Sequence, residues 1–363
     1  MWRADGTPVP LDDGWLVADD VVDARQREEL RKVVLVAATP AANFHGVVVE
    51  RHGALLAEFY FAGHDQPLGA WFSHEIQFGS KNHHDLRSIS KSVVALAVGV
   101  AHSEGKIPDL GRSALSYFPE LADLAASQKS AITLEHLLTM SAGLHWDESG
   151  SYARLDNSET RMAWARDPSR YVFSRPVASA AGSTFTYSGG NTLLLAEIVE
   201  RATGQDLGAY AEARLFKPLG IDAEWKRDRH GKVLAYSGLR MSPRSLLKFG
   251  RLLLDHGRWR GQQIVPEAWI AQILNPHLPT GEDGMFYSYQ WWLGEGTANG
   301  KPFRWIGGIG YGGQRLFIVP ELDLSVAITA GRYNQPWNGR ASHALLNEIV
   351  SALSLPHPNP PLR

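Results

Sequence analysis

A serine and a lysine stand three positions apart at the start of the most apolar helical stretch of the chain, residues 88–104. If Ser88 begins a helix there, Ser88 and Lys91 project from the same face of its first turn. A serine hydroxyl is a weak nucleophile, and a lysine amine desolvated against an apolar core loses its proton more readily and can accept the hydroxyl proton. The helix N-terminus also offers backbone N–H groups where an oxyanion would form. The spacing therefore predicts acyl transfer by Ser88, with Lys91 as its base.

The Ser-x-x-Lys spacing is not specific by itself, because it occurs twice more, at residues 103–106 and 245–248. Lys106 follows the end of the apolar helix and Lys248 lies in an amphipathic segment, so both are interpreted as structural. Lys91 differs because it lies at the edge of a nearly all-apolar helix, where a charged side chain requires a partner or a role. Spacing and burial alone leave the structural interpretation of Ser88 and Lys91 open.

A tyrosine turn and a glycine-rich segment are two further candidates. Tyr187 lies in the turn 185–191 that opens a helix, and a phenol placed between a hydroxyl and an amine can relay protons. Residues 305–314 carry five glycines beside a strand, which allows a substrate close to the backbone and leaves strand N–H groups free to donate to an oxyanion. Each feature also has a structural interpretation, a half-buried turn tyrosine and a flexible turn between strands.

The elements that must position these residues fall into two groups along the chain. Strand-like segments lie near both ends, and helical signals dominate the middle. We expect a hairpin at 44–61 around His52-Gly53, a loop at 62–87, strands at 303–306, 316–319 and 324–329, and amphipathic helices at 23–38 and 339–353. The simplest assembly is one mainly antiparallel sheet built from residues 1–104 and 241–363, flanked by the terminal helices, with a mostly helical domain, residues 105–240, inserted.

The order of the three candidates resembles that of a known superfamily. Ser88-x-x-Lys91, then the tyrosine turn about a hundred residues on, then a glycine-rich strand before Val319-Pro320-Glu321 is similar to the serine β-lactamases and penicillin-binding proteins. Segments 137–147 and 313–323 agree with this resemblance, which covers roughly residues 40 to 350. Within the superfamily, the likeness is to the class-C-like branch of family VIII carboxylesterases and 6-aminohexanoate-dimer hydrolases. It implies an α/β (α+β) β-lactamase-like fold, with the active site between the sheet and the helical domain.

The resemblance also implies roles for individual residues. Ser88 would be the acylated nucleophile, Lys91 its general base or proton partner, and Tyr187 the acid/base facing it. The oxyanion hole would be formed by the N–H groups of Ser88 and Gly308. Further substrate-binding candidates come from the glycine-rich strand and the helical-domain signature: Trp305, Gly307, Gln314 and Trp146. Helical-domain side chains such as Asp147 and Tyr152 are candidates for contacting a substrate amine.

Two departures from the superfamily pattern bear on the substrate. The tyrosine motif is usually Tyr-x-Asn, whereas this chain has Tyr187-Ser188-Gly189 and lacks the amide that would hold a substrate carbonyl. Where β-lactamases and transpeptidases have Lys-Thr-Gly, this chain has Trp305-Ile306-Gly307, so the lysine that helps bind a substrate carboxylate is absent. We therefore expect a serine hydrolase of small carboxylic esters or short amides. The alternatives are β-lactamase or D-Ala-D-Ala peptidase-like activity, or a catalytically weak binding module on the same scaffold.

Composition excludes several other classes of function. The 363 residues carry 36 Lys and Arg against 38 Asp and Glu, and a net charge of -2 gives no field with which to hold nucleic acid. Because the chain has no cysteine, it has no disulfide framework, no thiolate zinc site and no cysteine nucleophile. Its 12 tryptophans favour aromatic walls around an apolar acyl or alcohol pocket.

Rival enzyme classes find less support in the sequence. There is no Gly-x-Ser-x-Gly motif of an α/β-hydrolase. The groups His83-His84-Asp85 and His74-Glu75 form no zinc-binding helix motif, so we interpret them as loop residues and expect no metal and no cofactor. The first twenty residues lack a signal peptide pattern, and no apolar run approaches the roughly 20 residues of a membrane span. We expect a cytoplasmic enzyme with a small-molecule substrate, and a homodimer is left open.

Overall fold

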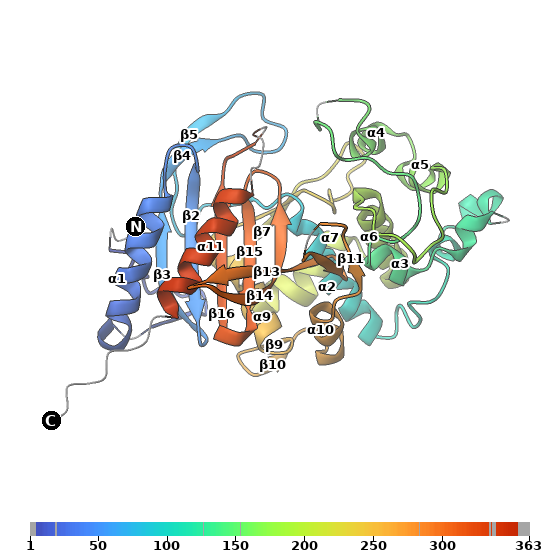
Figure 1. The fold of residues 1–363 in the computed structure, drawn as a ribbon. Helices are drawn as coiled ribbons and strands as arrows, with labels where there is room; N and C mark the ends of the chain where they lie inside the picture. Colours follow the sequence, from blue (N-terminus) through green and yellow to red (C-terminus); the bar gives the residue numbers. More distant parts are fainter. Residues whose placement is uncertain are drawn as a thin grey trace.

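A nine-stranded sheet forms the centre of the computed structural model, which describes residues 5–18, 20–125, 127–152, 154–282, 284–333, 335 and 339–354. The strand order is β1-β3-β2-β16-β15-β14-β13-β12-β11, and every pairing is antiparallel except that of β1 with β3. The strands come from both ends of the chain, as expected (Figure 1). Their bounds are β1 Leu16–Val17, β2 Phe44–Arg51, β3 Ala54–Tyr60, β11 Leu278–Pro279, β12 Phe286–Ser288, β13 Trp291–Ala298, β14 Lys301–Gly310, β15 Gln314–Val319 and β16 Leu324–Ala330.

The hairpin of β2 and β3 shows why the sheet forms here. Val47, Val48 and Val49 are all buried, so this run of β-branched side chains packs on both faces of the sheet. The turn residues His52 and Gly53 both have positive φ, of 54° and 83°, as a tight two-residue hairpin turn requires. The expected turn at this position is confirmed.

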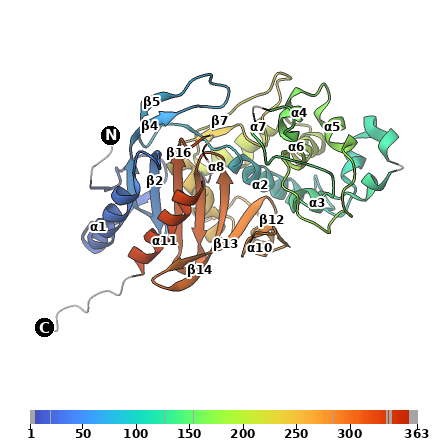
Figure 2. The same ribbon diagram turned by 45° about the horizontal axis from the view of Figure 1, so that its top comes forward.

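Helices cover both faces of the sheet. The terminal helices α1 (Asp20–Ala37) and α11 (Arg340–Leu353) pack on each other and enclose one apolar core, while α2 (Ile89–Ser103) and α9 (Pro243–Leu254) lie on the opposite face. Figure 2 shows α2 between the sheet and the group of helices that includes α3, α4, α5 and α6. The remaining helices are α3 Leu134–Leu138, α4 Ser158–Trp164, α5 Pro168–Ser174, α6 Gly189–Thr203, α7 Leu207–Ala211, α8 Lys217–Leu219 and α10 Glu267–Leu274.

The expectation that residues 62–87 form a loop is wrong. They contain three short strands, β4 (Ala62–Asp65), β5 (His74–Gln77) and β6 (His84–Asp85). Strands of two to four residues are too short to show a hydrophobic period, so the sequence pattern could not reveal them. The last one joins β7 (Ala223–Trp225) and β8 (Leu239–Met241) in a small three-stranded sheet, which anchors the chain directly before Ser88.

The C-terminal strands are longer and more numerous than the sequence pattern indicates. The glycine-rich segment is part strand and part turn: β14 continues to Gly310, and residues 311–313 form the turn to β15. Strands β12 and β13 were not expected, since β12 has only three residues and β13 includes glycine and glutamate. Within the part of the chain that the structure describes, no helix combines the length and apolarity needed to span a membrane.

Candidate active site

Ser88 follows a turn whose backbone is held in an unusual conformation. Arg87 has φ of 52°, in the left-handed region that residues other than glycine rarely adopt. Its guanidinium donates to the carbonyl of Gln66 at 2.9 Å and lies 4.5 Å from the centre of the Tyr333 ring. Buried Asp85 ties the same turn to β8 through an ion pair of 2.7 Å with Arg240. These contacts fix the chain between β6 and α2, where Ser88 occupies the N-cap position and its side chain makes no capping hydrogen bond.

Lys91 lies one helical turn after Ser88, as the spacing predicts. Its Nζ is 3.1 Å from Ser88 Oγ and donates to the carbonyl of Tyr236 at 2.9 Å. A third neighbour is the carboxyl of Glu159, whose Oε2 is 3.7 Å from Nζ. Only 1% of the lysine is exposed. The amine is therefore fully enclosed, with Ser88 on one side and polar acceptors around it.

The expectation that burial makes Lys91 a ready base is wrong. Burial is the largest influence and lowers its pKa, but the interactions with Tyr187, Glu159 and Glu148 together outweigh it, and the pKa is raised above its ordinary value. Lys91 therefore rests as an ammonium at neutral pH. Apolar sequence neighbours could not show this, because the acidic partners come from segments more than fifty residues away.

Tyr187 faces the same pair of residues. The centre of its ring is 5.0 Å from Lys91 Nζ, and the ring packs against Trp292 with centroids 5.5 Å apart. Burial raises the pKa of Tyr187, while Lys91 and a hydrogen bond with Ser88 lower it. Ser188 caps α6 by accepting from the N–H of Asn191, which fixes the turn that carries the phenol. The structure thus brings Ser88, Lys91 and Tyr187 together.

The glycines of β14 allow that strand to pass directly over the start of α2. A Cβ at Gly308 would lie 2.9 Å from Ile89, the residue after Ser88, and a Cβ at Gly310 would lie 2.3 Å from the carbonyl oxygen of Leu86. Any side chain at Gly310 would collide with backbone. Gly308, the expected oxyanion donor, therefore lies against Ile89, the residue after Ser88, because glycine stands there.

An open cleft of about 750 Å³ adjoins Ser88. Its walls are mostly aromatic and apolar, and they come from the 66–70 loop, from α4 and from the segments before β8 and after β14 and β16. Trp164 on its rim is 66% exposed. The lining residues include Gln66, Leu68, Ala70, Arg87, Ser88, Tyr152, Glu159, Thr160, Trp164, Arg229, Tyr236, Tyr311 and Tyr333. The expected aromatic walls are present, but they consist of tyrosines and one tryptophan.

Other residues expected to bind substrate lie elsewhere. Trp305 is 2% exposed and packs against Phe317 and His343, on the face of the sheet that α11 covers. Gln314 is buried, and its side chain bonds the backbone N–H and carbonyl of Ala330. The assignment of these two residues to the cleft is wrong. Side chains alternate between the two faces of a sheet. The side chain of Trp305 lies on the face that α11 covers, and that of Gln314 is held by the backbone of Ala330.

Gly307 and Trp146, which were also expected to bind substrate, are not among the residues that line the cleft. Gly307 is paired on both sides within the sheet, with Trp292 and with Phe317. Trp146 is 8% exposed and does not line the cleft, but its indole Nε1 donates to Glu148 Oε1 at 2.5 Å. Trp146 therefore contacts Glu148 and does not itself line the cleft.

Sequence reasoning missed Glu148 and Glu159, two carboxyls beside Lys91. Glu159 lies at the start of α4, where Asn157 caps the helix, and it is 7% exposed. Glu148 accepts the N–H of Gly189 at 2.5 Å. Acidic residues in a polar segment such as 147–160 resemble a solvated helix surface, so only the tertiary fold reveals that they turn inward.

The histidines include one buried cluster. Among the described residues, His45, Asp65 and His84 gather their ligand-type atoms within 4.8 Å of one another. His45 Nδ1 and His84 Nε2 are 2.7 Å apart, a hydrogen-bond distance and well short of the roughly 3.3 Å that separates two imidazole nitrogens on one tetrahedral zinc. His84 also bonds the carbonyl of Asp85 at 3.1 Å. His84 is thus a buried structural residue instead of the loop residue we expected.

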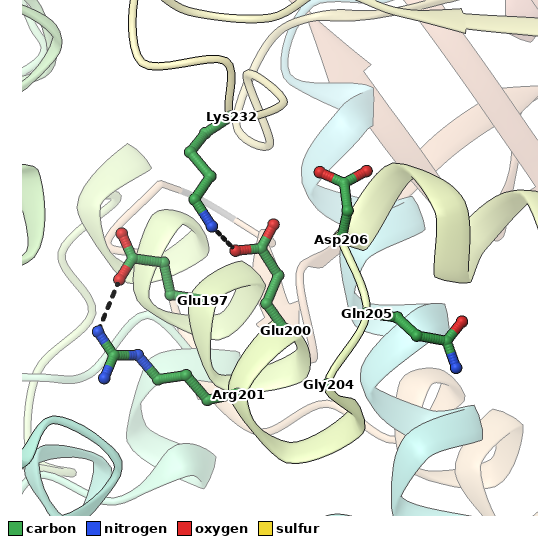
Figure 3. A pocket seen from close by; sticks show the side chains of 7 residues that line it. All are labelled: Glu197, Glu200, Arg201, Gly204, Gln205, Asp206 and Lys232. Carbon is green, nitrogen blue, oxygen red and sulfur yellow. Dashed lines mark hydrogen bonds and ion pairs between the residues drawn. The ribbon is translucent and has the colours of Figure 1, made fainter.

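A second hollow, of about 520 Å³, lies at the C-terminal end of α6 (Figure 3). Its charged side chains pair with one another: Glu197 with Arg201 at 3.6 Å, and Glu200 with Lys232. Asp206 pairs with Arg227 at 2.8 Å. The side chains that line this hollow are thus mostly charged groups engaged in ion pairs.

Comparison with known proteins agrees with this geometry. The family model described as Beta-lactamase matches residues 46–349. The chain belongs to the Beta-lactamase family. It is 28% identical over 329 residues to the 6-aminohexanoate-dimer hydrolase of Paenarthrobacter ureafaciens, covering 83% of this chain and 76% of that protein.

Two further proteins are similar over different extents. Esterase EstB of Burkholderia gladioli is 32% identical over 225 residues, covering 60% of this chain and 53% of the esterase. The crystal structure of a penicillin-binding protein homologue from Caulobacter crescentus superposes with a TM-score of 0.70 at 16% identity, covering 93% of this chain and 98% of that one. The structural likeness confirms the expected β-lactamase-like fold, and the named relatives are hydrolases of esters and amides.

Proposed function

We propose that this protein is a serine hydrolase that cleaves small carboxylic esters or short amides through an acyl-enzyme on Ser88. The observation that carries the proposal is the 3.1 Å contact between Ser88 Oγ and Lys91 Nζ, with the centre of the Tyr187 ring 5.0 Å from the same Nζ. A buried lysine held against a serine at the mouth of a cleft is the arrangement that nucleophilic catalysis requires. The two hydrolase relatives support the same reaction class.

The protonation states of Lys91 and Tyr187 define the order of steps. Lys91 rests as an ammonium and Tyr187 as a neutral phenol, so this pair must lose one proton before it can act as a base. It then takes the proton of Ser88 as Oγ attacks the carbonyl carbon. Tyr187 returns that proton to the leaving alcohol or amine, and water releases the acid in a second step. Lys91 therefore serves as a proton partner that holds positive charge beside the phenol.

The oxyanion of the tetrahedral intermediate would be held by the backbone N–H groups of Ser88 and Gly308. Support comes from the close packing of Gly308 against Ile89, which sets this strand beside the nucleophile. Donors fixed in this way need no reorganisation when charge develops on the carbonyl oxygen. Each N–H would contribute to the rate without contributing to binding of the ground state.

The cleft walls support a neutral, partly apolar substrate. Tyr152, Tyr236 and Tyr311 line it, and its two arginines have partners: Arg87 pairs with Asp85 at 3.5 Å, and Arg229 donates to the backbone carbonyls of Trp164 and Ala165. A panel of p-nitrophenyl esters of rising acyl length, the 6-aminohexanoate dimer and nitrocefin tests this preference. We expect ester or dimer hydrolysis that Ser88→Ala abolishes. Strong nitrocefin turnover with weak esterase activity would overturn the assignment.

A further inference from the structure

Arg315, on β15, is a buried cation without an acidic partner. Only 4% of the residue is exposed. Within the part of the chain that the structure describes, the hydrogen bonds of its side chain run from Nη1 alone, to the carbonyls of Gly310 at 3.0 Å and Gln314 at 2.7 Å. Its Nε is buried and has no hydrogen-bond partner. Burial of a charged group in this way is costly unless an opposite charge accompanies it.

The surrounding chain supplies no carboxylate for this guanidinium. No aspartate or glutamate occurs in residues 305–320, which include the second half of β14 and all of β15. The same is true of residues 324–347, which include β16 and the start of α11. Burial lowers the pKa of Arg315 to about 10, so the side chain is still a cation at neutral pH. Its charge therefore lacks a compensating charge among the described residues.

The N-terminus of α11 meets the same guanidinium. A Cβ on Gly339, the N-cap residue of this helix, would overlap Nη2 of Arg315 and lie 3.1 Å from Cζ and 3.8 Å from Nε. The edge formed by Nε and Nη2 thus faces the N-cap. Glycine has no side chain with which to cap the helix, and the first N–H groups of a helix lack intrahelical acceptors. Over 14 residues, α11 also places partial positive charge at this end.

The neighbouring side chains of α11 bring no negative charge to this position. His343 Nδ1 lies 3.0 Å from the carbonyl oxygen of Gly339, and the imidazole packs against Phe317 on the strand that carries Arg315. Burial and the charge of Arg315 lower the pKa of His343 to about 4, so the ring is neutral at pH 7. Ser342 donates to the carbonyl of Gly313.

We propose that Arg315 and the N-terminus of α11 bind a small inorganic oxyanion such as phosphate or sulfate. The Nε and Nη2 groups of an arginine are parallel donors that can bind two oxygens of one oxyanion. The N–H groups at the start of a helix are a second set of donors for the same ligand. The bound charge compensates the buried guanidinium. This site is separate from the active-site cleft, because neither Arg315 nor Gly339 lines the cleft.

A bound anion would stabilise the turn between β14 and β15. Arg315 spans this turn through its bonds to the carbonyls of Gly310 and Gln314, and Ser342 holds Gly313 from the start of α11. Tyr311 lies in the same turn and lines the cleft. An anion that holds the guanidinium in place should maintain these contacts, and ligand binding to the folded state raises its stability.

Equilibrium dialysis of the whole protein against radiolabelled inorganic phosphate tests the site directly. We expect one saturable phosphate per chain in the wild type and none in Arg315→Gln. Arg304→Gln is the matched control, because it removes the same charge from an exposed arginine on β14 that pairs with Glu321. It should bind phosphate as the wild type does. A wild type without saturable binding, or unchanged binding in Arg315→Gln, would overturn the proposal.

Thermal unfolding provides a test that keeps Arg315 in place. Saturating phosphate should raise the wild-type Tm by about 2 °C or more relative to sodium chloride of equal ionic strength. Gly339→Asp places a carboxylate beside Nη2, whereas Gly339→Asn adds a side chain of the same size without charge, and the two residues are similarly good helix caps. In chloride, Gly339→Asp should have the higher Tm and should respond less to phosphate. If the two variants respond equally, or if chloride raises the wild-type Tm as much as phosphate does, the inference is wrong.

Discussion

Lys91 Nζ lies 3.1 Å from Ser88 Oγ at the start of the buried helix α2. The two side chains meet because three residues separate them on one helical face, and they stay together because the carbonyl of Tyr236 accepts a second N–H of the lysine. Neither of the other Ser-x-x-Lys repeats offers this: Lys106 is exposed, and Lys248 donates to the carbonyls of Leu219 and Gly220. Lys248 is as buried as Lys91, so contact with a serine that lines a cleft, and not burial, distinguishes Lys91 from both.

Replacing Tyr187 by phenylalanine should slow acylation by about 10²-fold or more, because the phenol is the group that moves the proton between Ser88 and the leaving group. Stopped-flow release of p-nitrophenol measures this rate. Tyr210→Phe is the control, since its hydroxyl donates to Glu104 at the C-terminal end of α2, the opposite end from Ser88. Near-normal turnover in Tyr187→Phe would remove the phenol from the mechanism.

Trp305→Ala should act on stability and leave the acyl preference unchanged. The ring is buried against Phe317 and His343, so its loss opens a cavity worth about 3–5 kcal/mol of unfolding free energy, measured by urea denaturation. Trp164→Ala, on the cleft rim, should instead change KM for long acyl chains and leave stability almost unaltered. A shifted chain-length preference in Trp305→Ala would contradict this division.

Gly310→Ala should reduce activity because a Cβ there would meet the Leu86 carbonyl oxygen at 2.3 Å and push the 86–88 turn away from β14. The kcat for ester hydrolysis should fall by about 10-fold or more, since small misplacements of a nucleophile are costly. Gly53→Ala serves as the comparison, because a Cβ there meets nothing within 4 Å and the change strains only a remote turn. Full activity in Gly310→Ala would show that the close approach is unimportant.

Glu159 should make folding stability fall with rising pH. Its pKa is raised from 4.5 to about 8 in the folded protein, so the folded state binds more protons than the unfolded chain between these values. Stability is therefore lost as pH increases from about 4.5 to 8. Glu159→Gln lacks this loss, and its Tm relative to wild type should increase from pH 5 to pH 9. A constant difference in Tm over that range would contradict the raised pKa.

The sequence predicted the parts of the site that depend on local chemistry. The Ser88–Lys91 spacing follows from helical periodicity, and the antiparallel sheet from strand-like segments at both ends of the chain. It could not predict the direction of the Lys91 pKa, because Glu148 and Glu159 reach the lysine only through the packing of α6 on α2 and of α4 on α6. Trp305 was misplaced for a related reason: a strand position fixes which residues alternate, but not which face meets the substrate.

The most direct test of the account is the mass of the protein after brief reaction with a p-nitrophenyl ester, followed by peptide mapping. We predict one acyl group per chain, on the peptide that contains Ser88, absent from Ser88→Ala and retained by Ser103→Ala, whose serine lies in the second Ser-x-x-Lys repeat. An acyl group on any other residue, or ester hydrolysis that continues undiminished in Ser88→Ala, would contradict the central claim.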